Sequence, residues 1–453
     1  MMEELPKAAA VWRQAPSDAL WDPATAVRST AGDSAESRFV PFDSLLSDLR
    51  QGVAAASLGR GDFRVRTVRV SDVWPLILGA GETRELHSRA VQRNLLFPGD
   101  VVVSRVGRLG QASCVTKSAD ALVAREGVLV ARPLQKEWGP ALAAALCTDH
   151  VRDRLNKTRG TARSAILTKE ELGEVLVPSP NHFDFKEIAS LLEAAGKLVA
   201  EGYETLESVR EQIDRSLEGA PTEPLQQQFA WMTDPTWLPG WGWTDVQREL
   251  LVTRTRLPET SLIRLDEIMH RRGEQAKTVF VETPVPALRR DDIRSDWYLA
   301  IPAPWPEPPI SDPVQKPRSD SRREFLVTRE CLLIPTVGDI AAPPVVIPGK
   351  QLRQSGSQLR VAVSWLPLQG LEFPRAIAVL LDHPFLRLQR RLAAAFSTVT
   401  HLTREDIFEL RVPDLFENAW NGWEIELEEA HDLFIEAGSK ARLAVAIIER
   451  WYA

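Results

Sequence analysis

Two segments of the chain carry apolar residues in alternating steps of four and three positions. A strict 3.5-residue period is typical of the seam of a coiled coil. We therefore predict two long helices, over 183–219 and 424–453, that pack against each other, although each could instead cover only its own domain. The first seam is Ile188, Leu192, Ala195, Val199, Gly202, Leu206, Val209 and Ile213, and the second is Leu427, Ala430, Phe434, Ala437, Ala441, Ala444, Ile448 and Trp451.

The chain also repeats itself over a distance of 235 residues. Residues 167–178 read LTKEELGEVLVP and residues 402–413 read LTREDIFELRVP, with six of twelve positions identical. The same offset continues without a gap into the two predicted long helices. Because solenoid repeats have periods of roughly 20 to 50 residues, this offset indicates a duplicated domain. Thr168 with Glu171, and Thr403 with Asp406, predict a capping box at the start of a short helix in each copy.

The remaining pattern divides the chain into six parts. Short apolar stretches such as 100–107, 127–131 and 331–338 predict buried strands, and 141–155 and 374–396 have helical spacing. The predicted parts are an N-terminal arm over 1–37, a first domain over 38–182, a helix over 183–219, a Pro- and Trp-rich linker over 220–260, a second domain over 261–423 and a helix over 424–453. A Pro-rich tract within 301–317 predicts a loop inserted into the second domain.

Composition is that of an ordinary soluble protein, with 44% apolar and 26% charged residues among 453. The N-terminus has acids where a signal peptide needs bases, and no apolar run approaches 18 residues, so we expect a cytoplasmic protein without membrane contact. Cys114, Cys147 and Cys331 are scattered in apolar stretches without the spacing of metal ligands. We therefore expect buried thiols and no metal site.

Charge is distributed unevenly. Residues 51–169 hold 19 Lys and Arg against 10 acids, and 261–412 hold 21 against 18, whereas 170–260 hold 7 against 17 and 413–453 hold 3 against 9. The two domains are thus basic and the helical segments acidic, so a polyanion would be attracted to the domains. Acidic helix surfaces are also common in proteins that bind no polyanion.

Several motifs resemble one known family. Residues 96–110, LFPGDVVVSRVGRLG, resemble the stretch "GD, three apolar, S/T-R-x-G-x-x-G" in target-recognition domains of type I restriction–modification specificity subunits. Residues 160–163, 167–172 and 175–180 resemble the turn, short helix and "I-P-x-P" exit that lead into a long helix there. The resemblance covers about 38–218 well. It is looser over 262–453, where Gly338 remains but the GxxG loop and its Arg are missing. A second departure lies before the first long helix, where Asn181-His-Phe-Asp replaces the usual Gln-rich start.

The resemblance implies an α+β fold with two repeated target-recognition domains, separated by two long antiparallel coiled-coil helices about a pseudo-two-fold axis. It further implies that each domain reads one half of a split DNA target while the helices set the distance between the halves. The same helices would bind two copies of a modification subunit, an adenine methyltransferase that binds S-adenosylmethionine, and possibly a restriction translocase or nuclease. The expected role is DNA modification and phage defence.

Catalytic motifs are missing from the sequence. Asp234-Pro-Thr-Trp237 lacks the second proline of an amino-methyltransferase motif, and there is no glycine-rich nucleotide loop. The seven histidines show no paired metal spacing. We therefore expect a non-catalytic DNA reader without a cofactor of its own. The alternative is an adaptor of a phage-defence complex that reads DNA only through its first domain.

Candidate DNA-binding residues surround glycines and basic loops, because backbone near glycine can approach phosphate while Arg and Gln read base edges. Solvated charged loops are the alternative. The candidates are Arg105, Arg108, Gln111 and Lys117; Lys157, Arg159, Arg163 and Ser164; and, in the second domain, Arg322, Arg323, Lys350, Arg353, Gln354, Gln358 and Arg360.

Apolar residues beside the two seams predict a surface for a partner. Residues that flank a two-helix seam would be exposed in the isolated protein, and exposed apolar patches mark interaction sites. Because the helices are repeats, we expect two related patches and two copies of one partner. The candidates are Leu191 and Tyr203, with Phe183 and Phe185, on the first helix, and Leu443, Val445 and Ile447 on the second.

Overall fold

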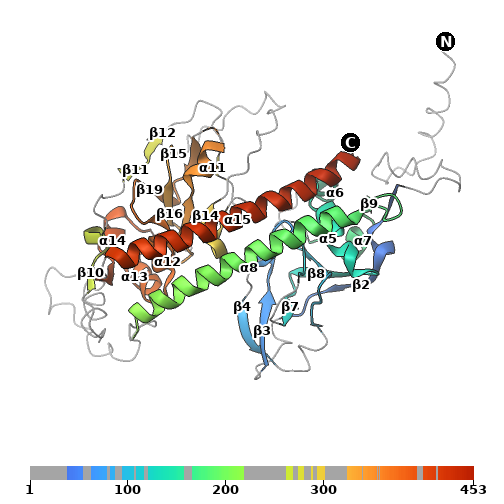
Figure 1. Cartoon of the computed structure of the whole chain (residues 1–453), viewed down its shortest axis with the longest axis horizontal. Helices are drawn as coiled ribbons and strands as arrows, with labels where there is room; N and C mark the ends of the chain where they lie inside the picture. The colour runs from blue at the N-terminus through green and yellow to red at the C-terminus, as the bar shows by residue number, and fades with distance from the viewer. Residues whose placement is uncertain are drawn as a thin grey trace, which may run out of the picture.

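The computed structural model has two lobes at opposite ends of a pair of long helices, α8 (Phe185–Ser216) and α15 (Glu417–Tyr452) (Figure 1). Trp423 Nε1 donates a hydrogen bond to Gln212 Oε1 (2.9 Å), and the Phe183 ring meets the Trp451 ring edge-on, so the helices run antiparallel. The structure describes residues 38–54, 63–78, 82–86, 94–106, 109–116, 121–157, 166–218, 262–268, 274–279, 287–288, 293–300, 324–338, 340–354, 356, 358–394, 401–414 and 417–452.

The predicted seams are confirmed. All eight seam residues of α8 are buried, as are seven of the eight on α15, where Trp451 is half-buried. A Cβ atom on Gly202 would lie 2.6 Å from Cε1 of Phe434, so any larger residue at this close approach of the helices would force the ring to shift. The second helix begins at Glu417, seven positions before the predicted start at 424.

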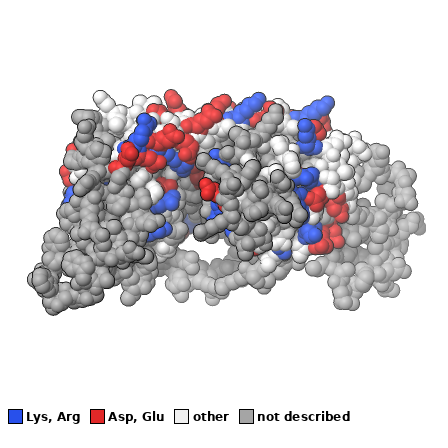
Figure 2. Space-filling model, turned by 90° about the horizontal axis from the view of Figure 1, so that it is seen from below, with Lys and Arg blue, Asp and Glu red and all other residues white. Residues whose placement is uncertain are grey.

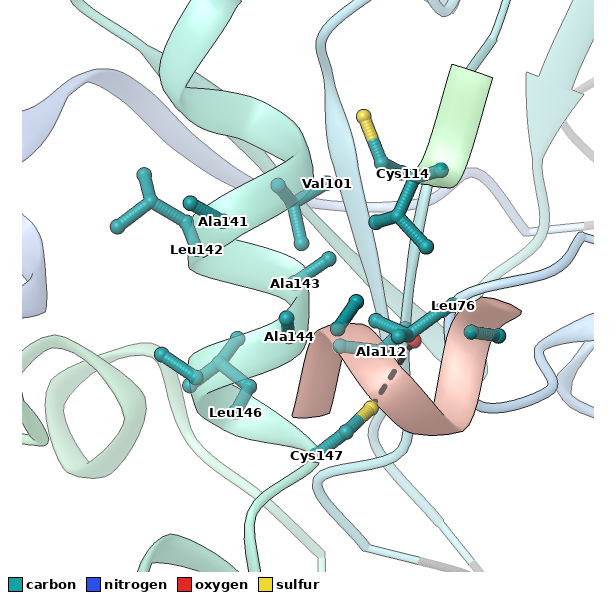
Figure 3. Packing of buried hydrophobic residues seen from close by; sticks show 14 of the residues in the cluster. Leu76, Val101, Ala112, Cys114, Ala141, Leu142, Ala143, Ala144, Leu146 and Cys147 are labelled. Carbon is teal, nitrogen blue, oxygen red and sulfur yellow. Dashed lines mark hydrogen bonds between the residues drawn. The ribbon is translucent and has the colours of Figure 1, made fainter. Parts of the chain in front are cut away.

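The first domain combines short sheets with helices on one side. Figure 3 shows small side chains of α5 facing Val101 and Ala112, and the Cys147 thiol donates to the Ala112 carbonyl oxygen (3.2 Å). Its sheets are β1–β9, β2–β8–β5–β6 and β4–β3–β7. Its strands are β1 (Phe39–Pro41), β2 (Leu46–Gln51), β3 (Phe63–Val68), β4 (Glu82–Leu86), β5 (Val101–Ser104), β6 (Ala112–Cys114), β7 (Leu122–Ala124), β8 (Val128–Pro133) and β9 (Leu176–Pro178), and its helices are η1 (Phe42–Leu45), η2 (Val70–Asp72), η3 (Lys136–Trp138), α5 (Gly139–Leu146), α6 (Asp149–Lys157) and α7 (Lys169–Gly173).

The second domain has the same plan with a larger central sheet. Its sheets are β10–β20, β11–β19–β16–β17–β14–β13 and β12–β15–β18. Its strands are β10 (Leu262–Arg264), β11 (Glu274–Gln275), β12 (Lys277–Val279), β13 (Ile293–Arg294), β14 (Leu299–Ala300), β15 (Glu324–Val327), β16 (Cys331–Pro335), β17 (Val345–Ile347), β18 (Leu359–Ala362), β19 (Trp365–Gln369) and β20 (Arg411–Pro413), and its helices are α10 (Leu265–Ile268), η6 (Ser295–Trp297), α11 (Gly349–Gln354), α12 (Pro374–Asp382), α13 (Pro384–Ala394) and α14 (Arg404–Phe408).

The predicted duplication is confirmed in space. Helices α5, α6 and α7 and strand β9 each begin 235 positions before α12, α13, α14 and β20. The order β2–β8–β5–β6 corresponds to β11–β19–β16–β17. Both capping boxes form: the Glu171 backbone N–H donates to Thr168 Oγ1 (3.1 Å), and that of Asp406 to Thr403 Oγ1 (3.2 Å). The copies diverge in the third sheet, because β3 and β7 are parallel whereas β15 and β18 are antiparallel.

An approximate two-fold axis relates the two halves. Each long helix ends on the opposite domain, at the junction of two equivalent helices. On α15, Glu449 Oε1 accepts from the Asp149 backbone N–H (3.2 Å) at the start of α6. On α8, Asp214 Oδ1 lies 3.4 Å from His383 Nε2, between α12 and α13. Asp214 and Glu449 are again 235 positions apart, and in Figure 1 the two sets of strands lie on opposite sides of the helix pair. The predicted α+β fold with antiparallel helices is thus confirmed.

The three cysteines are buried and free, as expected. Burial raises the pKa of Cys114 to about 12 and that of Cys147 to about 11, so both thiols are protonated at neutral pH. Within the described ranges no helix is long and apolar enough to cross a membrane. The predicted arm 1–37, linker 220–260 and Pro-rich tract 301–317 lie outside the described residues.

Candidate nucleic-acid interface

The glycine turn of the first domain is joined to the repeat motif. Arg105 follows β5, and its backbone oxygen accepts from the Leu167 N–H (2.8 Å) while its Nε donates to the Leu167 oxygen (3.1 Å). On the other side of the turn, Gly110 has φ +76°, and a Cβ there would lie 2.6 Å from Leu155 Cδ1 on α6. The two motifs that the resemblance selected therefore meet at one corner of the domain, through Arg105 of the first and Leu167 of the second.

This corner changes the roles of two candidates. Gln111 is only 4% exposed, and its backbone oxygen accepts a hydrogen bond from the Ser104 N–H (2.8 Å). A buried amide cannot present both polar atoms to an adenine, so the expectation that Gln111 reads a base edge is corrected. Arg105 is half-buried and uses its Nε to hold Leu167, so its first role is to position the corner.

The other candidates of the first domain are not described in atomic detail. Lys157 is the last residue of α6, and its side chain is not described. The remaining five lie outside the described residues: Arg108, Lys117, Arg159, Arg163 and Ser164.

Two charged candidates of the second domain are paired within the protein. Lys350 Nζ lies 2.6 Å from Asp432 Oδ2, which belongs to α15, and Arg360 donates to Glu324 Oε2 (3.1 Å) on the neighbouring strand. Arg353 on α11 and Gln358 are exposed. Gln354 ends α11 with its side chain undescribed, and 322–323 lie outside the described residues. Lys350 and Arg360 thus each have an acidic partner within the protein, and their contact with DNA stays a prediction.

The surface charge follows this pairing. On the face in Figure 2, basic and acidic side chains are intermixed, and the described residues form no continuous basic field there. The basic surplus counted from the sequence of the first domain includes Arg108, Lys117, Arg159 and Arg163, which the structure does not describe.

The predicted partner surface is largely covered. Phe183 and Phe185 are buried, and Tyr203 donates to Asp296 Oδ2 of the second domain (2.6 Å), so the expectation that these three are exposed is wrong. The physical reason is that the domains pack against the flanks of the helix pair, so the residues beside the seam are covered by the domains and not by solvent. Leu191, Val445 and Ile447 are half-buried against the core of the first domain, and only Leu443, at 49%, is well exposed among the candidates.

The structure has two adjoining grooves near the start of α8, and the sequence did not predict these grooves. The groove beside α8 lies between η3 and residues 180–193, and its neighbour runs past the exposed Phe97 and Leu134. Glu137 lines both. Acids predominate over bases in the first groove, so it is unsuited to nucleic acid.

Comparisons with known proteins find a likeness to solved structures. No protein-family model and no curated protein matches the chain. A structure of a type I R-M system, described for its complex assembly and conformational transition, is 16% identical over 91% of this chain and 96% of its own, with a TM-score of 0.27. The HsdS subunit from Thermoanaerobacter tengcongensis is 16% identical over 91% and 95%, with a TM-score of 0.28. The type I restriction–modification S subunit from M. genitalium is 10% identical over 91% and 94%, with a TM-score of 0.31. Scores this low carry no argument about function.

Proposed function

We propose that this protein is a non-catalytic, sequence-specific DNA-recognition subunit that reads a bipartite target. One observation carries the proposal: two copies of one domain are held in opposite sense at the ends of an antiparallel helix pair. A two-fold frame with repeated domains suits a target of two half-sites, as in dimeric DNA readers. The motif resemblance of residues 96–110 and 160–180 supports the same role.

The corner around Arg105 is the proposed DNA-contacting part of the first domain. The segments 106–109 and 155–167 start from this one corner, because Arg105 binds Leu167 and Gly110 packs on Leu155. These segments carry Arg108, Lys157, Arg159, Arg163 and Ser164 in the sequence, and we infer that these residues contact DNA. Arg side chains there would contact phosphates and guanine edges.

The proposed partners follow from the same role. The protein would direct two copies of an adenine methyltransferase to the target, in host DNA modification and phage defence in the cytoplasm. A restriction translocase or nuclease is a further candidate partner. S-adenosylmethionine would be bound by the methyltransferase and not by this chain.

The test is a genome-wide map of methylated adenines with and without this protein, in cells that contain its proposed methyltransferase partner. The expected result is a split motif that disappears without the protein. In binding assays, Arg108→Ala should weaken binding to that motif by about 1–3 kcal/mol if Arg108 reads a base edge. Lys197→Ala, an exposed residue of α8 paired with Glu193, is the control and should leave binding unchanged. An unchanged methylation map would overturn the proposal.

A second candidate function is an adaptor of a phage-defence complex with DNA reading only in the first domain. It is favoured by the internal pairing of Lys350 with Asp432 and of Arg360 with Glu324. Arg353→Ala distinguishes the two functions. Relaxed preference in one half-site of this variant supports reading by both domains, whereas an unchanged sequence preference supports the adaptor.

A further inference from the structure

A second repeated element lies near the approximate two-fold axis. The first domain contains Ser71-Asp-Val-Trp-Pro-Leu76 beside η2, and the second contains Ser295-Asp-Trp-Tyr-Leu299 at η6. Among the described residues, Leu76 (φ +66°) and Tyr298 (φ +52°) are the only non-glycine residues with positive φ. Leu76 then pairs in parallel with Ser113 in β6, and Leu299 pairs in parallel with Val346 in β17, the strand equivalent to β6. The two segments are therefore structural equivalents.

These equivalent segments contact each other. The Arg294 guanidinium carbon lies 4.1 Å from the ring centroid of Trp74 in the first domain and 3.7 Å from that of Trp297. Arg294 also donates to both oxygens of Asp296, at 3.2 Å each, and is only 6% exposed. A desolvated guanidinium between two indole rings is a favourable cation–π arrangement. It joins the two domains directly, without the helices.

The same segment holds both long helices. The Trp297 ring stacks on Phe434 of α15, with centroids 4.5 Å apart and planes at 4°. Its Nε1 donates to the Tyr203 hydroxyl of α8 (3.1 Å), and that hydroxyl donates to Asp296 (2.6 Å). Burial alone would raise the pKa of Asp296, but the Arg294 charge and the hydrogen bonds from Arg294 and Tyr203 lower it below the ordinary value. Asp296 is therefore ionised and bound on both sides.

Tyr298, which has the positive φ, directs its side chain away from that of Trp297. Its hydroxyl donates to Asp382 Oδ2 (2.6 Å) and accepts from Arg210 (2.9 Å). Trp297 thus belongs to the core cluster of the first domain, and Tyr298 to that of the second. Strained backbone of this kind is kept only where the surrounding contacts fix it.

We propose that this axial junction, formed by Trp74, Tyr203, Arg294, Asp296, Trp297 and Phe434, fixes the distance and angle between the two domains and thereby selects the spacing between the two half-sites. The helix pair sets the direction of the spacer, and the contact at the axis adds a direct restraint between the two domains. One base pair of extra spacing requires a displacement of about 3.4 Å, which would separate the stacked guanidinium from its rings. This inference rests on the proposed DNA-reading function.

The first experiment measures the geometry without DNA. Spin labels are placed on the full chain at Glu137→Cys in the first domain and Glu372→Cys in the second, both exposed positions, while the native thiols are buried. Arg294→Lys keeps the charge beside Asp296 but removes the planar stack, and Trp74→Leu removes one ring. Both variants should broaden the distance distribution relative to the wild-type chain, with unchanged helix content.

The matched control is Arg132→Lys. Arg132 binds Asp100 (2.8 Å) and lies 4.6 Å from the Phe97 centroid, an equivalent arrangement wholly inside the first domain. It should leave the distance distribution narrow. Equal breadth in Arg294→Lys, Trp74→Leu and the wild type would overturn the junction.

The second experiment uses duplexes in which the spacing of the two half-sites varies one base pair at a time, with the protein in complex with its methyltransferase. Arg294→Lys should reduce the preference for the favoured spacing over its neighbours by about threefold to tenfold, the effect of weakening the cation–π contact with Trp74 that joins the two domains. An unchanged preference despite a broadened distance distribution would overturn the selection of spacing. If the wild type binds no duplex, the proposed function fails, while the distance measurement still decides whether the junction holds the domains.

Discussion

Replacing Gly202 by alanine tests the close approach of the two long helices. The added Cβ would lie 2.6 Å from Cε1, 2.9 Å from Cζ and 3.0 Å from Cδ1 of Phe434. The ring cannot turn away freely, because it is fully buried and stacked on Trp297. Forcing a methyl group into such packing costs about 1–3 kcal/mol. Alanine in place of a glycine inside a helix recovers about 1 kcal/mol, so Gly202→Ala should lower the free energy of unfolding by roughly 0–2 kcal/mol.

Gly438→Ala is the matched control on the partner helix. Nothing lies within 4 Å of a Cβ built at Gly438, so this variant should gain about 1 kcal/mol from helix propensity alone. The difference between the two variants isolates the clash. It is measured by urea denaturation of the full chain, followed by circular dichroism at the helical band.

A double variant makes the assignment specific to Phe434. Phe434→Leu alone should destabilise the protein through lost burial and stacking, but it shortens the side chain that the new methyl group meets. Gly202→Ala with Phe434→Leu should therefore lose less than the sum of the two single losses. If Gly202→Ala is as stabilising as Gly438→Ala, or if the losses simply add, the helices do not approach as described.

Three further predictions concern other parts of the chain. Burial and the charge of Arg375 lower the pKa of His431 to about 3 from an ordinary 6.5. The contribution of the neutral imidazole to stability is therefore complete above pH 6.5 and is lost as pH falls toward 3. Between pH 7.5 and 5.5, the free energy of unfolding of the wild type should fall by about 1.4 kcal/mol more than that of His431→Leu in urea denaturation. Thr168→Ala and Thr403→Ala should each lower the free energy of unfolding by about 0.5–2 kcal/mol in the same assay, because each breaks a capping box. Serine at either position should keep the stability of the wild type. Leu443→Asp, at an exposed position of α15, should reduce co-purification of the methyltransferase without changing the melting temperature, and full co-purification would remove Leu443 from the partner surface.

The sequence determined the helices, their pairing seam and the duplication. Heptad spacing follows from the geometry of the helix itself, so the positions from Ile188 to Ile213 could be assigned to the buried seam without tertiary information. The capping boxes at Thr168 and Thr403 are likewise local, since each joins residues three positions apart. The resemblance also selected the two motifs that contain Arg105 and Leu167, but it did not predict their contact.

Tertiary structure alone decided which polar and apolar side chains remain available. Tyr203 lies beside the seam in sequence, but Asp296, 93 positions away, covers it. Lys350 is paired with Asp432, 82 positions away, and no spacing rule predicts a pairing of that kind. The axial junction had a signal, the repeated Ser-Asp before a tryptophan, but its offset is near 224 rather than 235 and different insertions separate the copies. Local periodicity fixes which face of a helix is apolar, whereas burial of its flanks depends on segments that only the folded chain brings together.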